Sequence, residues 1–85
     1  MKVSAGSLES SDCLITLSPS KELKITIESS LFDQFGDQIH EVILETLKAN
    51  NLFEIAVVCL DKGALDYTIK ARMETAIKRM RENNE

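Results

Sequence analysis

Residues 13–28, CLITLSPSKELKITIE, contain the clearest secondary-structure pattern in the chain. Apolar residues recur at every second position in the two halves of this stretch, and a period of two is typical of a strand with one buried face. Between the halves, SPSK at 18–21 supplies turn residues. The stretch therefore predicts a β-hairpin. Its expected inward positions are Cys13, Ile15 and Leu17, then Leu23, Ile25 and Ile27.

Two amphipathic helices are predicted after this hairpin, with a third strand between them. Apolar residues recur at helical spacing from about residue 33 to 50, and Asn50–Asn51 is the expected stop. Residues 53–60 form a nearly continuous apolar run rich in β-branched residues, which favours a strand. The predicted core stripes are Phe35, Ile39, Val42, Ile43 and Leu47 in the first helix and Leu65, Ile69, Met73, Ala76, Ile77 and Met80 in the second.

The element order ββαβα predicts an α+β fold in which two helices cover one face of a three-stranded antiparallel sheet. A strand–helix–strand connection can skip one position, which would put the 13–17 strand in the centre. The expected spatial order, with strands numbered along the chain, is 2-1-3. Residues 1–85 are predicted to form a single domain, and residues 1–11 a flexible N-terminal lead-in.

Size and charge limit the function classes. With 85 residues, 44% of them hydrophobic, the chain can bury one modest core but has little material for an enclosed active site. Residues 1–61 contain ten acidic and four basic residues, within an overall net charge of −4, which argues against nucleic acid as a partner. Neither a signal peptide nor a bilayer-spanning run is evident. We therefore expect a cytoplasmic protein with no membrane partner.

Catalytic and metal-binding patterns are not evident in the sequence. His40 is expected on the surface of the first helix, and Cys13 and Cys59 lie in strand-like runs, where a thiol usually behaves as a small hydrophobe. One histidine and two distant cysteines do not have the spacing of a metal site. A small hydrolase is the weakest functional interpretation, because the pattern places no base near a serine.

The segment GSLESSD, residues 6–12, places serines between carboxylates, which on local chemistry alone favours an ordinary solvated loop. In the predicted topology, however, Ser10 lies at the same end of the domain as both helix N-termini. Helix N-termini attract phosphate groups, and Lys62 and Gly63 are close enough in this arrangement to contact one. Taken singly, the acidic residues near the helix starts are explained as caps: Asp33, Asp37 and Asp66.

Three segments occur together in the chain: GSLESSD at 6–12, QFGD at 34–37 followed by Ile39, and DKGALD at 61–66. With KARME at 70–74, this combination resembles the acyl carrier protein of citrate lyase, its γ subunit. The resemblance extends from about Gly6 to Arg79 and so covers nearly the whole chain.

The resemblance implies a carrier subunit and not an enzyme. Its serine, at Ser10, would hold a phosphoribosyl dephospho-coenzyme A arm through a phosphodiester, with an acetyl thioester at the far end. The α subunit would exchange the acetyl group for citrate, and the β subunit would cleave the citryl thioester to oxaloacetate. Many relatives have glycine after the attachment serine, whereas this chain has Ser11, which is therefore the alternative site.

Flanking charges would guide the partners, which are the two lyase subunits and the transferase that attaches the arm. The expected recognition charges are Glu9, Asp12 and Asp37. Two alternatives stay open: a carrier of the malonate decarboxylase type, which uses a related arm, and an acidic interaction module that is never modified. The Leu-Glu-Ser motif at 8–10 and the 61–66 turn favour citrate lyase.

Overall fold

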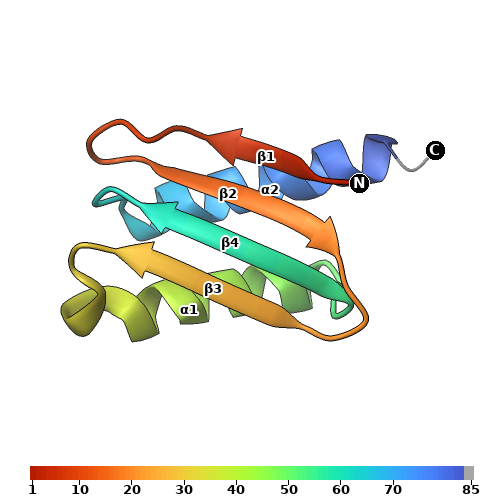
Figure 1. The fold of residues 1–85 in the computed structure, drawn as a ribbon, viewed down its shortest axis with the longest axis horizontal. Helices are drawn as coiled ribbons and strands as arrows, with labels where there is room; N and C mark the ends of the chain where they lie inside the picture. The colour runs from red at the N-terminus through yellow and green to blue at the C-terminus, as the bar shows by residue number, and fades with distance from the viewer. Residues whose placement is uncertain (84–85) are drawn as a thin grey trace.

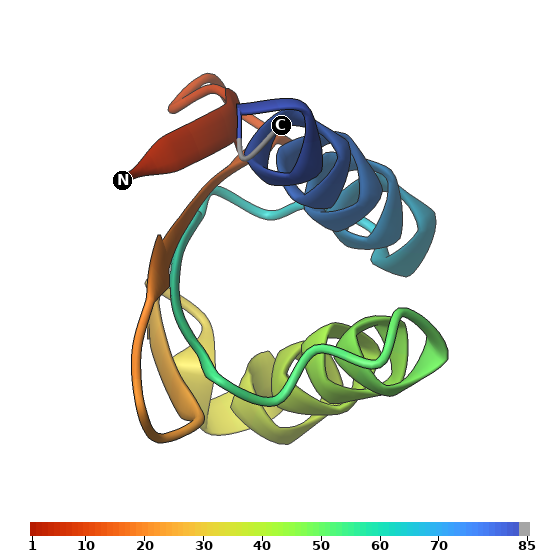
Figure 2. The same cartoon turned by 90° about the vertical axis from the view of Figure 1, so that its right-hand side faces the viewer.

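The computed structural model describes residues 1–83 and shows two helices packed on one face of a four-stranded sheet (Figure 1). The predicted α+β class and the placement of both helices on one face are confirmed (Figure 2). Residues 84 and 85, which the single-domain prediction includes, lie outside the described residues. The elements are β1 (Val3–Gly6), β2 (Cys13–Pro19), β3 (Lys24–Ser29), α1 (Phe32–Ala49), β4 (Ile55–Asp61) and α2 (Asp66–Asn83).

The strand order corrects the prediction of a three-stranded antiparallel sheet. The sheet is mixed, with order β1-β2-β4-β3, so the predicted order 2-1-3 is wrong. β4 lies between β2 and β3, antiparallel to β2 and parallel to β3 (Figure 1). The expected hairpin between 13–17 and 23–27 therefore does not form. The physical reason lies in β4, the most continuously apolar strand, which pairs along both edges when it is central.

The N-terminal residues also differ from the expected flexible lead-in. Val3–Gly6 forms β1, which pairs antiparallel with β2, and Val3 and Ala5 are buried against the core. Gly6 ends the strand at φ 98°, and a Cβ at this position would collide with the carbonyl oxygen of Cys13. Four residues are too short for the alternation to be recognised in the sequence.

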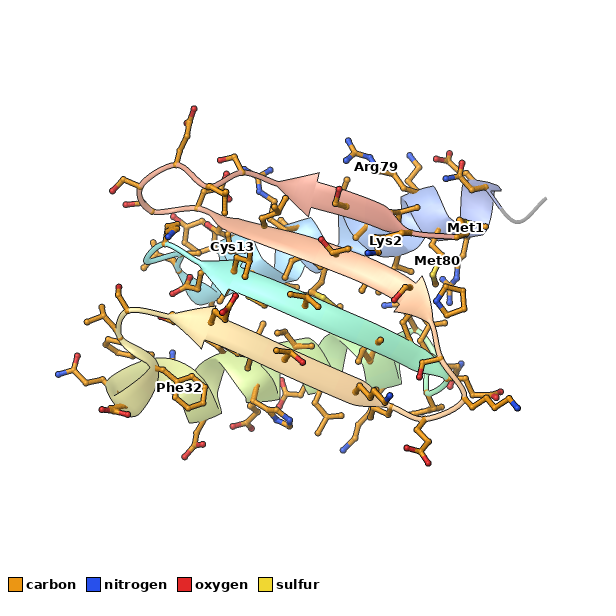
Figure 3. All side chains as sticks on the ribbon, in the orientation of Figure 1. Met1, Lys2, Cys13, Phe32, Arg79 and Met80 are labelled. Carbon is orange, nitrogen blue, oxygen red and sulfur yellow. The ribbon has the colours of Figure 1, made fainter. Side chains whose placement is uncertain are left out.

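The core lies between the inner face of the sheet and the two helices (Figure 3). Inward positions alternate along β2, as the period of two predicts, and they also alternate along β4. In the second predicted strand Ile25 and Ile27 are partly buried, but Leu23 precedes β3 and is exposed, so its predicted inward position is wrong. Nine of the eleven predicted helix positions are buried or partly buried, and the exceptions, Phe35 and Leu65, are exposed. The buried apolar residues are Val3, Ala5, Cys13, Ile15, Leu17, Ile39, Ile43, Leu47, Ile55, Val57, Cys59, Ile69, Met73, Ala76, Ile77 and Met80.

Candidate functional site

Five segments converge at one end of the sheet: the start of β2, the ends of β3 and β4, and the N-termini of both helices (Figure 1). The register shows this directly, because Asp61 at the end of β4 is paired with Cys13 on one side and Ser29 on the other. The predicted convergence therefore occurs even though the strand order differs. Phosphate binding at this end stays a prediction.

The loop of residues 7–12 presents Ser10 at this end. Ser7 Oγ donates a hydrogen bond of 2.7 Å to a carboxylate oxygen of Asp12, and the backbone N–H of Asp12 donates to the carbonyl oxygen of Glu9 at 3.1 Å. Ser10 is exposed, and its hydroxyl makes no hydrogen bond with the other residues of the 1–83 segment. Hydrogen bonds between residues of the loop therefore order it, while Ser10 faces solvent.

A salt bridge fastens this loop to α2. Arg72 donates to both oxygens of Asp12, from Nε at 2.9 Å and from a terminal nitrogen at 3.0 Å. The hydrogen bonds from Arg72, then from Ser7 and the Cys13 N–H, hold the pKa of Asp12 well below its usual range. The Asp12 side chain is 14% exposed, so its charge is largely engaged within the chain. By contrast, Glu9 and Asp37, the other two expected recognition charges, are exposed.

The turn after β4 is joined to the same loop by backbone hydrogen bonds. Ser11 N–H donates to the Lys62 carbonyl oxygen at 2.7 Å, and Lys62 N–H donates to the Asp12 carbonyl oxygen at 2.8 Å. Lys62 and Gly63 thus lie beside the serine loop, as the sequence suggested. Ser11 has φ 67°, a left-handed conformation that glycine adopts more easily. A glycine at this position would adopt the conformation without the steric cost that serine carries.

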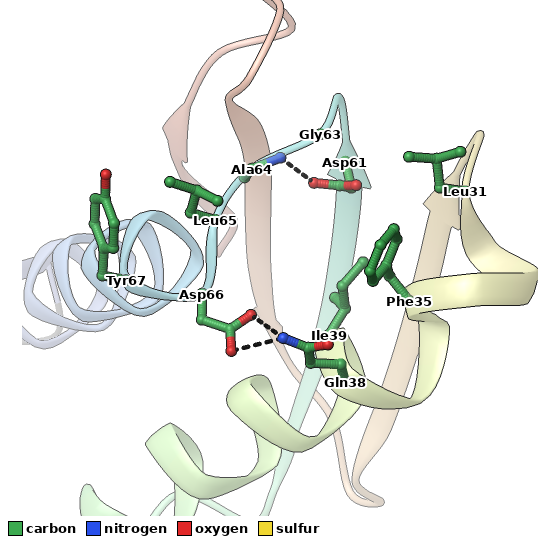
Figure 4. Close-up of a pocket in the computed structure, with 10 residues that line it drawn as sticks. All are labelled: Leu31, Phe35, Gln38, Ile39, Asp61, Gly63, Ala64, Leu65, Asp66 and Tyr67. Carbon is green, nitrogen blue, oxygen red and sulfur yellow. Dashed lines mark hydrogen bonds between the residues drawn. The ribbon is translucent and has the colours of Figure 1, made fainter.

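A groove of about 420 Å³ opens beside the 61–63 turn (Figure 4). Leu31 and Phe35 of the α1 side lie across from Leu65, which precedes α2 (Figure 4). Phe35 and Leu65 are 44% and 59% exposed, although their helical spacing predicted core positions. Periodicity assigns a residue to the inner face of a helix, but whether another element covers that residue depends on tertiary packing. These two apolar side chains are therefore groove walls.

The polar side chains of the groove are an amide, two carboxylates and the phenol of Tyr67. Gln38 Nε2 donates to both oxygens of Asp66, each at 2.9 Å, and so links α1 to the start of α2 (Figure 4). Asp61 is 5% exposed and accepts hydrogen bonds from Ser29 Oγ and the Ala64 N–H, both at 2.9 Å. No pattern in the sequence predicted a role for the Gln38 or Asp61 side chain. For Asp61, the available signal was a carboxylate between an apolar strand and a glycine turn.

The remaining reactive side chains lie apart from the serine loop or are buried. His40 is exposed on α1, and Cys13 and Cys59 are buried free thiols. A hydrogen bond with Cys13 and burial raise the pKa of Cys59, which favours the neutral thiol. Across residues 1–83, His, Cys, Asp and Glu side chains form no cluster suited to a metal ion. In the same range, no helix has the length and apolarity needed to cross a membrane.

The fold and site define a class: a small α+β domain that presents an exposed serine on a loop joined to the helix layer by a salt bridge. The family model described as ACP, malonate decarboxylase delta subunit (MdcD), matches residues 1–80. The chain is also 54% identical over 77 residues to the citrate lyase acyl carrier protein of Streptococcus mutans, covering 88% of this chain and 76% of that protein.

Two further relatives have the same name. The citrate lyase acyl carrier protein of Treponema denticola is 43% identical over 77 residues, covering 91% of this chain and 88% of the relative. That of Fusobacterium nucleatum is 43% identical over 83 residues, covering 95% and 88%. The chain therefore belongs to the acyl carrier protein family of citrate lyase and the malonate decarboxylase delta subunit. The resemblance seen in the sequence motifs is confirmed.

Proposed function

We propose that this chain acts in the cytoplasm as the acyl carrier subunit of citrate lyase, with a phosphoribosyl dephospho-coenzyme A arm on Ser10. The observation that carries the proposal is the exposed Ser10 hydroxyl on a fastened loop, in a chain of this family. When bound, the arm supplies a thiol that holds an acyl group as a thioester. The chain transports this group, and the partner subunits catalyse its exchange and cleavage.

The residues of the loop fit such an arm. Attachment requires an accessible hydroxyl, and Ser10 offers one, whereas the hydroxyl of Ser7 is bonded to Asp12. A strongly nucleophilic serine would be a disadvantage in a carrier, since the transferase supplies the catalysis. Lys62, at the neighbouring turn, would neutralise part of the phosphodiester charge, and Gly63 would leave room for it, because nothing lies within 4 Å of a Cβ built there.

Ser11 is the less suitable of the two adjacent serines. It is also exposed, but its N–H is bonded to Lys62 and its backbone has the left-handed conformation. Ser10 carries neither constraint and lies nearer the middle of the loop. We therefore assign the arm to Ser10 and retain Ser11 as the alternative.

The partners of this function are the α and β subunits of citrate lyase and the transferase. Glu9 and Asp37 are exposed acidic residues on the half of the chain where acidic residues predominate, and they would guide basic partner surfaces. Asp12 would contribute mainly by holding the loop through Arg72. A long flexible arm lets one acyl group reach two active sites at high effective concentration.

The test is intact-protein mass with peptide mapping after co-expression with the arm-transferring enzymes. Wild type and Ser11→Ala are expected to gain the mass of the arm, and Ser10→Ala to lack it. If the gain disappears only in Ser11→Ala, the carrier function stands and the site moves by one residue. If wild type is never modified, the unmodified interaction module becomes the better interpretation.

A second candidate is the acyl carrier of malonate decarboxylase, because the matching family model has that description. The names of the relatives and their identity of 43–54% favour citrate lyase. Reconstitution separates the two: the arm-bearing chain is expected to restore citrate cleavage to citrate lyase α and β subunits. Restoration of malonate decarboxylation alone would favour the second candidate.

A further inference from the structure

We propose that the groove between the starts of α1 and α2 binds the adenine ring of the arm, an inference that rests on the proposed function. The arm contains an adenosine close to its attachment point and a thiol at its far end. The groove would hold the near part of the arm and leave the far part free.

The position of the groove is the first argument. Ser11 is bonded to Lys62 through its backbone, and the next residue, Gly63, already lines the groove. A phosphoribosyl unit on Ser10 would pass over this turn before the adenosine begins. The groove thus lies along the path that the first part of the arm takes from the serine.

Shape and surface are the second argument. The volume of about 420 Å³ falls within the range of small-molecule sites, about 300–1,000 Å³, and exceeds the need of one flat heterocycle. The Phe35 ring lies opposite Leu65, so a planar base would insert between an aromatic and an aliphatic wall (Figure 4). Both walls belong to the predicted core stripes and are left partly exposed, at 44% and 59%.

The charge of the groove is the third argument, because it determines which part of the arm can bind there. Of the described residues that line the groove, none is a lysine or arginine, while two are the carboxylates Asp61 and Asp66. Such a groove repels the diphosphate of the arm and favours a neutral group that donates hydrogen bonds. Adenine presents an amino donor beside a ring acceptor, a pair that the amide of a glutamine matches. Gln38 is the amide on this wall: its Oε1 would accept from the amino group, and its Nε2 would exchange one of its two bonds to Asp66 for a bond to the ring acceptor. The Asp66 carboxylate beside it is a second acceptor for the amino group (Figure 4).

Binding of the base in this groove would shorten the freely moving part of the arm. The diphosphate and the thiol end would extend into solvent from the rim, where they remain available to the partner subunits. The carrier would therefore present a partly ordered arm, with a smaller entropy loss when a partner captures the thiol end.

The experiment uses the whole unmodified chain, labelled with nitrogen-15, and two soluble probes. Dephospho-coenzyme A contains the adenosine, and phosphopantetheine is the matching probe without it. We expect dephospho-coenzyme A to shift the amide signals of Gln38, Gly63 and Leu65, and phosphopantetheine to leave them in place. Equal shifts with both probes, or none with dephospho-coenzyme A at millimolar concentration, would overturn the assignment of adenine.

A matched pair of variants tests the aromatic wall. Phe35→Leu keeps an apolar side chain but removes the ring. We expect its affinity for dephospho-coenzyme A to fall about fivefold, which corresponds to the low end of base–aromatic stacking energies. Phe53→Leu is the control, because Phe53 is similarly exposed, at 52%, but does not line the groove. Equal affinities in both variants would contradict the stacking role.

The arm-bearing protein separates this inference from the proposed function. Nuclear Overhauser contacts are expected between the adenine protons and the side chains of Phe35 and Leu65. If mass mapping places the arm on Ser10 and these contacts are absent, the carrier function stands and groove binding is overturned. If no arm is attached but dephospho-coenzyme A still binds and phosphopantetheine does not, the preference of the groove for adenine stands and the Ser10 assignment is overturned.

Discussion

The two ends of the sheet are held in different ways. At the Ser10 end, buried or partly buried carboxylates organise the loops: Asp12 is paired with Arg72, and Asp61 is bonded to Ser29 and Ala64. At the opposite end, around the C-terminus of α1, no carboxylate of residues 1–83 takes this part: backbone bonds such as Leu52 N–H to the Leu47 carbonyl oxygen at 3.0 Å combine with bonds from Arg81 to Asn50 and from the Asn50 amide to the Thr46 carbonyl oxygen. Side-chain bonding at the first end orders three loops while leaving a serine and a groove open.

The same difference appears within the helix stripes. Ile43 and Leu47 in the second half of α1 are fully buried, whereas Phe35 near its start is 44% exposed. The open end is therefore not poor in apolar residues. It has apolar residues that the fold leaves uncovered, and such surfaces commonly mark binding sites.

The largest loss of stability is expected from Asp61→Ala, which removes the carboxylate at the Ser10 end of β4. Two donors, Ser29 Oγ and the Ala64 N–H, would lose their acceptor. We expect a loss of about 2 kcal/mol in the free energy of unfolding, measured in urea. Glu54→Ala, at an exposed position beside the other end of β4, is the control and is expected to change it by less than about 0.5 kcal/mol. Similar losses in the two variants would remove the distinction between the ends.

A smaller effect is expected from Asp12→Asn, because Arg72 is 41% exposed. Since the pKa of Asp12 is lowered in the folded state, its ion pair stabilises the fold fully above the ordinary Asp value of about 4. This contribution is lost as the pH falls from there toward the lowered pKa. The urea midpoint of wild type should therefore drop more between about pH 6 and about pH 3 than that of the variant.

The control for this pH dependence is Glu9→Gln, because Glu9 is exposed on the same loop. Its midpoint is expected to follow that of wild type at both pH values. If the urea midpoint of Asp12→Asn falls with pH as steeply as that of wild type, another carboxylate causes the loss of stability at low pH.

Within residues 1–83, two residues other than glycine have positive φ, and they provide a finer comparison because Ser11 lies at one end and Asn51 at the other. Ser11→Gly should stabilise the fold by about 0.5 kcal/mol, because glycine relieves the steric cost of φ 67°. Asn51→Gly should have a smaller effect, since asparagine tolerates this conformation better than serine does. Urea unfolding of both variants tests the difference, and destabilisation by Ser11→Gly would contradict it.

The smallest effect on the fold is expected from Lys62→Glu, because the Lys62 side chain is exposed and only its backbone is bonded to the loop. The unfolding curve should be unchanged, while attachment of the arm slows or the attached arm becomes more mobile. Time-resolved mass measurements and nuclear magnetic resonance relaxation test this. Unchanged attachment kinetics together with unchanged arm mobility would exclude the phosphate contact.

The α+β class, the inner faces of most elements and the family could be predicted from the sequence, because apolar periodicity and short motifs are local properties of the chain. The sequence also predicted that Ser10 and the two helix N-termini lie at one end. Three features became visible only in the folded chain: the central position of β4, the pairing of Asp12 with Arg72, and the exposure of Phe35 and Leu65. These features depend on which distant segments compete for the same strand edge or the same space, and no local pattern records that outcome.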